Sequence, residues 1–327
     1  MRLDENFNLE ANGYKIALDS RGSGCDCCFV SHAHSDHTSA LRGKNKKILA
    51  SDATLSLTGF DKQTLEEARL AGVKIELLPS GHMLGSRQIR VEHDSEIFTY
   101  TGDFKLSESL TAEPARVEQT DILMIEGTFG EPSTKFPERH EVYEQIAKFT
   151  KENYEKGNIV LLGGYTLGKA EELVSIVNKY CGLTPVVSEK IGAACDVYSS
   201  FGVRLDAAGI GSEKAEEIMK GNFVAVMPMH QVNFDLAVKL SRAHKRSVYS
   251  AVATGWAGST RFQVDAAFPL SDHADFAEIM EYVERASPKK IYCCHGNEDI
   301  LSRELRKRGF NASAVGETEV QLSLGEC

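Results

Sequence analysis

Residues 31–37 read SHAHSDH and directly follow the apolar run CCFV at 27–30. In a loop after a strand, the pattern H-x-H-x-D-H directs four side chains, those of His32, His34, Asp36 and His37, at one point. Imidazoles and carboxylates together are good ligands for Zn²⁺ or Mn²⁺. A solvated polar loop is the alternative, but four such residues within six positions favour a metal-binding loop.

One loop cannot complete two metal shells, and further ligands stand at the ends of other apolar runs. His82 follows VKIELLP, Asp103 follows IFTY, and His295 follows KKIYCC. An acid placed just after a buried strand is costly unless it is paired or ligated. Each signal is weak alone, and together they predict one shared site.

The pattern of apolar residues divides the chain. Up to Gly127, short apolar runs predict strands at 14–19, 28–33, 46–51, 73–79, 88–93, 97–102 and 121–127, whereas 64–72 has helical periodicity. After Gly127, helices and strands alternate, which predicts βα units and a parallel sheet. Helices are expected at 138–157, 168–180, 234–244, 276–286 and 298–309, and strands at 158–164, 184–188, 223–228, 246–255 and 289–296.

Composition is that of an ordinary globular protein, with 42% hydrophobic and 26% charged residues. The net charge of −10 argues against nonspecific binding to polyanions. It does not exclude a nucleic-acid substrate, because charges more than about 10 Å away are screened. The chain has no apolar run of 18 residues, so no membrane span is predicted, and no secretory signal is expected.

The eight cysteines, several adjacent and beside apolar residues, suit reduced thiols and a cytoplasmic location. Cys25, Cys27 and Cys28 are read as strand cysteines. A metal cluster is the alternative, and it lacks a spaced second pair.

The ordered set Asp19, HAHSDH, His82, Asp103 and His295 resembles the metallo-β-lactamase superfamily. That resemblance implies an α/β fold, an αββα sandwich with two divalent metals, most simply Zn²⁺ with Mn²⁺ as the alternative. It assigns one metal to His32, His34, His82 and Asp103, and the other to Asp36, His37, Asp103 and His295, with Asp103 bridging. Asp19 would orient the ligands.

Between Asp103 and His295 lie 295 − 103 = 192 positions, which indicates an insertion. The whole chain then resembles the β-CASP nuclease group, in particular its short forms, the ligase-associated DNA exonucleases and the archaeal exonucleases of RNA 3′-end processing. Glu126 in MIEGTFG, His273 in LSDHADF and His295 in CCHGNE match the motifs of that group. The implied parts are a sandwich segment at 1–127, an α/β cap at 128–255 and a second sandwich segment at 256–327.

The resemblance also implies catalytic roles. His273 would contact the scissile phosphate and protonate the leaving oxygen, Glu126 would hold His273, and Asp36 would act as a ligand and as a base. Either Ser271 or Asp272 is expected to cap the following helix.

Substrate contacts are predicted for Lys169, Ser271 and Trp256. Lys169 ends GGYTLGK at 163–169, which fits a P-loop except that Ala170 stands where Ser or Thr is required. We therefore prefer a role for Lys169 and the adjacent helix N-terminus in binding a substrate phosphate.

The sequence thus predicts a metal-dependent exonuclease that uses a hydroxide activated by two metals on single-stranded RNA or DNA. The alternatives are a small-substrate hydrolase on the same scaffold, such as a phosphodiesterase or lactonase, and a non-catalytic subunit of a processing complex. A homo-oligomer or a repair or processing partner is left open.

Overall fold

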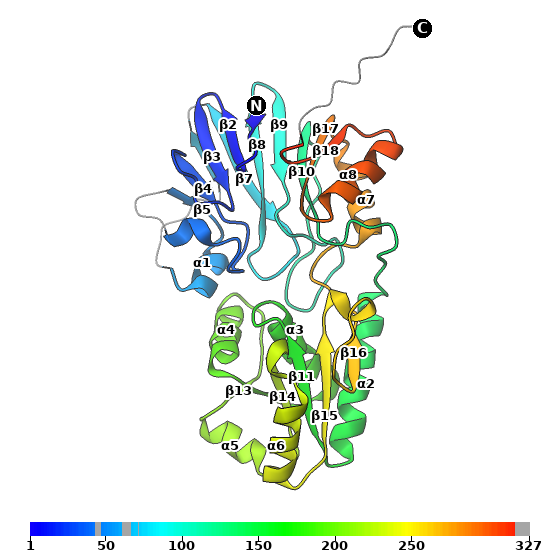
Figure 1. Cartoon of the computed structure of the whole chain (residues 1–327). Helices are drawn as coiled ribbons and strands as arrows, with labels where there is room; N and C mark the ends of the chain where they lie inside the picture. Colours follow the sequence, from blue (N-terminus) through cyan, green and yellow to red (C-terminus); the bar gives the residue numbers. More distant parts are fainter. Residues whose placement is uncertain (43–46, 61–66, 71, 318–327) are drawn as a thin grey trace.

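The computed structural model describes residues 1–42, 47–60, 67–70 and 72–317. Three sheets account for the strands, two in the upper part of Figure 1 and one in the lower part. The first sheet has the order β1-β2-β3-β4-β5, with β1 (Arg2–Leu3), β2 (Asn8–Ala11), β3 (Tyr14–Leu18), β4 (Cys27–Phe29) and β5 (Lys47–Leu49).

The second sheet has the order β18-β17-β10-β9-β8-β7-β6. Its strands are β6 (Glu67–Leu70), β7 (Val73–Pro79), β8 (Arg87–His93), β9 (Glu96–Tyr100), β10 (Ile122–Gly127), β17 (Lys290–Gly296) and β18 (Ala312–Ala314). Strands β6 to β9 pair antiparallel, and β10, β17 and β18 extend the sheet in parallel. Strands β7, β9, β10 and β17 therefore run in the same direction and end at one edge.

The two upper sheets face each other across an apolar core that includes Leu18, Phe29, Ile89 and Phe98. Helices α7 (Phe276–Ala286) and α8 (Glu298–Lys307) cover the outer face of the second sheet. The outer face of the first sheet is covered by α1 (Asp52–Thr58) and the 3₁₀ turn η1 (Ser39–Arg42). These four layers form the predicted αββα sandwich.

The third sheet belongs to the cap and is wholly parallel, in the order β13-β12-β14-β11-β15-β16. Its strands are β11 (Ile159–Gly164), β12 (Val186–Val187), β13 (Ala208–Gly209), β14 (Val224–Pro228), β15 (Val248–Ala253) and β16 (Ala266–Phe268). Its helices are α2 (Arg139–Glu155), α3 (Lys169–Ile176), α4 (Glu189–Ser200), α5 (Glu213–Met219) and α6 (Phe234–His244), with the short turns η2 (Val177–Cys181), η3 (Met229–Gln231) and η4 (Gly255–Gly258).

Apolar faces explain how the cap is layered. Helices α2, α3 and α4 pack on one face of the cap sheet through residues such as Val142, Leu173 and Ile191. Helices α5 and α6 pack on the other face, where Ala215 and Leu236 lie. Among the described helices, none combines the length and apolar character that a membrane crossing requires.

One expectation is corrected, and one strand lies beyond the range predicted for the cap. The helical periodicity at 64–72 is misleading, because Glu67–Leu70 form edge strand β6, paired antiparallel with β7; residues 64–66 and 71 lie outside the described ranges. The hydrogen bonds of a β ladder outweigh helix propensity at this sheet edge. The cap sheet also continues past 255, since β16 pairs with β15 through Val252 and Ala267.

Candidate metal centre and active site

A cavity of about 780 Å³ lies where the carboxyl ends of the sandwich strands meet the cap. The loop after β4 contributes His34, Asp36 and His37 to its wall, and other segments of the sandwich contribute His82, Asp103, His273 and His295. From the cap come Tyr165, Lys169, Lys190, Thr254 and Trp256. Segments that are far apart in the chain therefore meet in one concave site, as ligand sites commonly do.

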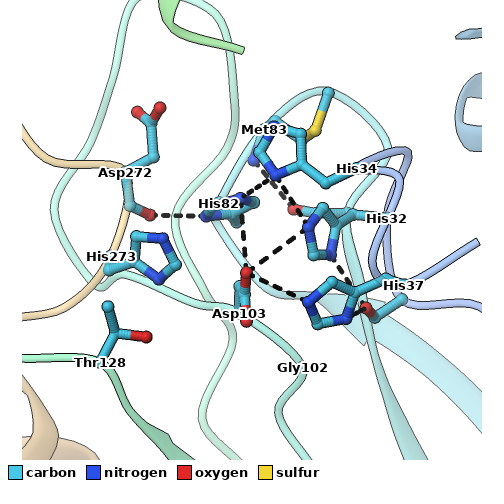
Figure 2. Close-up of polar contacts among 12 residues, drawn as sticks. His32, His34, His37, His82, Met83, Gly102, Asp103, Thr128, Asp272 and His273 are labelled. Atoms are coloured by element: carbon cyan, nitrogen blue, oxygen red, sulfur yellow. Dashed lines mark hydrogen bonds and ion pairs between the residues drawn. The ribbon is translucent and has the colours of Figure 1, made fainter. Parts of the chain in front are cut away.

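Four predicted ligands converge on one another, and three of them line this cavity (Figure 2). One ligand atom from each of His32, His34, His82 and Asp103 lies within 4.8 Å of the other three. Nδ1 of His34 is 3.0 Å from Nε2 of His32 and 3.1 Å from Nε2 of His82. The Oδ2 atom of Asp103 is 3.5 Å from His32 Nε2 and 3.8 Å from His82 Nε2.

The outer hydrogen bonds of the three rings fit a cation at the centre. His32 Nδ1 lies 2.9 Å from Ser31 Oγ, His82 Nδ1 lies 3.0 Å from the carbonyl of Asp272, and His34 Nε2 lies 3.2 Å from the carbonyl of Leu167. A neutral ring that donates outward from one nitrogen presents an unprotonated lone pair at the other. Three lone pairs and a carboxylate then face one point, which is the donor set of a divalent metal.

Electrostatics agree with neutral rings at His32 and His82. Burial, together with the charge of neighbouring imidazoles, lowers the pKa of both His32 and His82 well below the ordinary value. Burial also raises the pKa of Asp103, against the pull of His37. A buried carboxylate in this position is relieved by a bound cation.

Asp19 lies behind the cluster and organises the loop. Its carboxylate accepts hydrogen bonds from the backbone N–H and the hydroxyl of Ser31, at 2.7 and 2.6 Å, and lies 2.8 Å from His37 Nδ1. Burial opposes a charged His37, but Asp19 followed by Asp103 outweighs it and raises the pKa of His37 to about 10. Asp19 therefore orients both the loop and His37.

The ligands predicted for the second metal lie farther apart. Nε2 of His37 is 3.6 Å from both Asp36 Oδ2 and Asp103 Oδ2, but the Asp36 side chain is 78% exposed. Nε2 of His295 lies 3.0 Å from the hydroxyl of Tyr100, which donates to Asp19 at 3.0 Å. Within the described ranges, neither Asp36 nor His295 joins a tight group of three metal-ligating atoms.

His273 lines the cavity and pairs with Glu126 behind it; the Glu126 side chain is buried, whereas that of His273 is 24% exposed. Nδ1 of His273 is 3.0 Å from both carboxylate oxygens of Glu126, and Phe104 N–H also donates to that carboxylate, at 2.9 Å. Burial disfavours the imidazolium, but Glu126 outweighs it and raises the pKa of His273 to about 9. Atoms of Asp103, Glu126 and His273 also lie within 4.8 Å of one another, so this trio could itself hold a cation.

Two glycines allow the ligand loops to approach each other. Gly81 precedes His82 at φ +84°, and a Cβ there would lie 2.2 Å from the carbonyl oxygen of Lys105. Gly102 precedes Asp103 at φ +56°, and a Cβ there would lie 2.6 Å from Cβ of Ser31. Any other residue would push these loops apart.

The predicted substrate contacts differ in their surroundings. Trp256 is 40% exposed, lines the cavity and packs on Phe129 with ring centroids 4.6 Å apart. Ser271 is buried, and its hydroxyl bonds to the backbone of His273. Lys169 is also buried, and its amine is held by Glu172 and Asp272, at 3.2 and 2.7 Å, so it presents no free charge to a phosphate.

The residue that caps the N-terminus of helix α7 also differs from the expected one. Asp275, rather than Ser271 or Asp272, accepts from the backbone N–H groups of Ala277 and Glu278. This leaves the side chain of Asp272 to pair with Lys169.

Sequence reasoning missed two residues that support the site, Tyr100 and the carboxylate of Asp272. Tyr100 lies at the end of β9, two residues before the Gly-Asp pair, and that position at a strand end was its only signal. Asp272 stands beside His273, and its partner Lys169 is 103 residues away. Neither contact could be identified without knowing which strand ends meet.

The N-terminal cysteines stand apart from the metal centre. Cys27 and Cys28 are buried on opposite faces of β4, in two different apolar clusters. The thiol of Cys25 lies 3.2 Å from the side-chain oxygen of Asn8. Within the described ranges, none of the three belongs to a group that could hold a metal.

Comparison with known families matches residues 265–315 to the Zn-dependent metallo-hydrolase RNA specificity domain. The chain is 34% identical to a probable DNA ligase of Opitutus terrae, over 91% of this chain and 29% of that protein. It is 25% identical to the DNA cross-link repair protein SNM1 of Arabidopsis thaliana, over 88% of this chain and 64% of that protein.

A shorter alignment, 31% identical, matches an RNase J-like protein of Methanocaldococcus jannaschii over 47% of this chain and 44% of that protein. The chain thus spans less than two thirds of each of these curated relatives. Among solved structures, a protein of unknown function from Enterococcus faecalis superposes with a TM-score of 0.61 at 14% identity, covering 88% of this chain and 78% of that one.

Proposed function

This chain belongs to the β-CASP group of the metallo-β-lactamase superfamily, and on that basis we propose that it is a metal-dependent nuclease acting on single-stranded nucleic acid. The observation that carries the proposal is the convergence of three imidazoles and Asp103 beside the His273–Glu126 pair, at one cavity. Metal ligands and a proton donor are the two parts that phosphodiester hydrolysis needs.

The residues divide between two metal positions. His32, His34, His82 and Asp103 would hold the first ion, and Asp36, His37 and His295 would join Asp103 around a second. The mixture of imidazole and carboxylate donors favours Zn²⁺, with Mn²⁺ as the alternative. When bound, the metal supplies Lewis acidity, which polarises the phosphate and lowers the pKa of water.

His273 is suited to protonate the leaving oxygen. Glu126 holds its Nδ1, which leaves Nε2 as the nitrogen that can donate to a ligand. The adjacent carboxylate keeps the imidazolium populated, so the proton is available at neutral pH. Asp36, exposed on the same cavity, can accept a proton or complete the second metal shell.

The cavity wall supports a single strand as the substrate. Trp256 and Tyr165, 40% and 48% exposed, offer flat rings on which bases can stack. Arg42 and Lys190 line the same cavity and are both exposed, so they offer positive charge to a phosphate backbone despite the net charge of −10. A duplex would have to unstack before its bases reached these rings.

We favour DNA over RNA as the polymer. The relatives that align with about nine tenths of this chain are named for DNA ligation and cross-link repair. The RNase J-like relative aligns with under half. RNA is the competing substrate, because residues 265–315 match a domain whose description includes RNA specificity.

The test is a matched digestion of one single-stranded sequence made as DNA and as RNA, 5′-labelled, with Zn²⁺ or Mn²⁺. We expect cleavage of DNA that is lost in His273→Ala and retained in His230→Ala, a control histidine exposed on η3 and outside the cavity. The product ladder distinguishes exonuclease from endonuclease action and gives the polarity. Metal-loaded protein that cleaves neither polymer but hydrolyses a small phosphodiester or lactone would refute the proposal.

A further inference from the structure

A buried cluster of charged side chains lies between the cap and the metal centre. Lys169 and Glu172 come from the first turn of α3, Arg139 is the first residue of α2, and Asp272 belongs to the loop before α7. Lys169 Nζ donates to Asp272 at 2.7 Å and to Glu172 at 3.2 Å. Arg139 donates to Glu172 at 2.6 and 3.1 Å and to Asp272 at 3.2 Å.

The ion pairs of the cluster match in number, and the buried amine of Lys105 lies beside them. Two cations face two carboxylates, and Lys169, Glu172 and Asp272 are all buried. Tyr143 completes the cluster, accepting from Arg139 Nε at 2.8 Å and donating to Glu172 at 2.5 Å. Such an arrangement is costly to desolvate and contributes little to stability compared with apolar packing, so a function for its geometry is the better explanation.

Asp272 connects this cluster to the candidate metal centre. While its carboxylate pairs with the cap cations, its backbone carbonyl lies 3.0 Å from Nδ1 of His82 (Figure 2). The next residue, His273, pairs with Glu126. One dipeptide thus carries both the acceptor that orients a metal ligand and the proposed proton donor.

His82 is also held from its backbone side. Lys105, which is buried, donates from Nζ to the carbonyl oxygens of Gly81 and, at 3.2 Å, of His82. At its Nδ1 atom the ring of His82 is oriented by the carbonyl of Asp272. The side chain of Asp272 is in turn held by its ion pairs with Lys169 and Arg139.

We propose that Lys169 is a positioning residue: with Arg139 and Glu172 it fixes Asp272, whose carbonyl orients His82 for the metal and whose neighbour is His273. The proposal rests on the proposed function for its kinetic readout, but its metal-binding readout is independent of the substrate. It replaces the interpretation of Lys169 as a phosphate ligand, because the buried amine is already paired with two carboxylates.

The two possible roles of Lys169 predict that its loss changes different quantities. A residue that contacts the substrate raises KM when it is lost and leaves metal affinity unchanged. A positioning residue lowers metal affinity and kcat and leaves KM unchanged. Lys169→Met retains most of the side-chain volume and removes the charge, so it separates the two.

The experiment measures Zn²⁺ affinity by competition with a chromogenic chelator, and kcat and KM on a single-stranded oligonucleotide. We expect Lys169→Met to weaken Zn²⁺ binding by about 10- to 100-fold, the range found when the support of a ligand is removed. Asp272→Asn should act in the same direction. Lys169→Arg, which keeps the charge, should recover most of the affinity.

Val224→Ala is the matched control, because Val224 is an apolar residue buried in the cap core on β14 and takes part in none of the hydrogen bonds or ion pairs given above for the cluster. It should lower thermal stability without changing Zn²⁺ affinity, which separates general loosening from loss of positioning. Folded Lys169→Met or Asp272→Asn with wild-type Zn²⁺ affinity would overturn the inference. Wild-type protein that binds Zn²⁺ and cleaves no nucleic acid would refute the proposed function. The comparison of Zn²⁺ affinities would still decide whether Lys169 is a positioning residue.

Discussion

Replacing Glu171 by glutamine should stabilise the protein at alkaline pH and have much less effect in acid. Glu171 is fully buried in the first turn of α3. One carboxylate oxygen accepts from the N–H of Gly168 at 2.6 Å, and the other has no hydrogen-bond partner in the described part of the chain. Burial raises the pKa of Glu171 from 4.5 to about 8.

The sign of the effect follows from proton binding. Between pH 4.5 and about 8 the folded protein retains a proton that the unfolded chain releases. The contribution of Glu171 to stability is therefore complete below pH 4.5 and is lost as the pH rises through about 8. Glutamine has the shape of the protonated acid and does not titrate, so the variant escapes this loss.

The pKa change sets a ceiling of about 5 kcal/mol, at about 1.4 kcal/mol for each pH unit. Relaxation and water penetration reduce such ceilings, and we expect about 2–3 kcal/mol. In a chain of this size that corresponds to a Tm shift of roughly 3–4 °C. The assay is thermal unfolding of the wild type and of Glu171→Gln at pH 5 and at pH 9. The quantity compared is the Tm of the variant minus that of the wild type, which should be larger at pH 9 than at pH 5.

Glu172 is the matched control, because it is the next residue, is equally buried and behaves in the opposite way. Burial opposes its charge, but Arg139 and Lys169 outweigh burial and lower the pKa of Glu172 to about 2. Its contribution is present above pH 4.5 and is lost only as the pH falls through about 2. Glu172→Gln should therefore destabilise by about 3–5 kcal/mol at both pH 5 and pH 9, since it leaves two buried cations with one carboxylate. An effect of Glu171→Gln that is the same at both pH values would refute the reasoning.

Three further predictions concern the site. Asp103→Asn should lower both metal content and turnover, because its carboxylate lies between the two ligand sets; elemental analysis that finds full occupancy of two metals would contradict a bridging role. His273→Ala should reduce kcat by about 10²- to 10⁴-fold with metal content unchanged; loss of metal instead would make His273 a ligand, as its proximity to Asp103 and Glu126 allows. Trp256→Ala should weaken binding of a single-stranded oligonucleotide by roughly 5- to 10-fold, about 1 kcal/mol of stacking, and leave kcat unchanged; an unchanged Kd by fluorescence titration would show that the ring serves packing on Phe129 alone.

Much of the fold follows from local patterns. The runs around 73–79, 88–93, 97–100 and 122–127 form strands because their apolar residues supply the faces that the sandwich buries. The periodicity at 64–72 was misleading because helical spacing in the sequence did not decide the outcome: Glu67–Leu70 form a strand by pairing with β7. The strand at Ala266–Phe268 has a similar origin: it forms by pairing with β15.

The residue types and order of the metal-binding cluster are properties of the sequence itself, since a metal selects imidazoles and carboxylates, and local spacing determines what one loop can present. What the tertiary structure alone decided is the pairing of distant groups. Lys169 meets Asp272 rather than a substrate, and Tyr100 meets His295 across 195 positions. Such contacts depend on where whole strands and helices pack, and that arrangement results from burial summed over both domains rather than from the residues that meet.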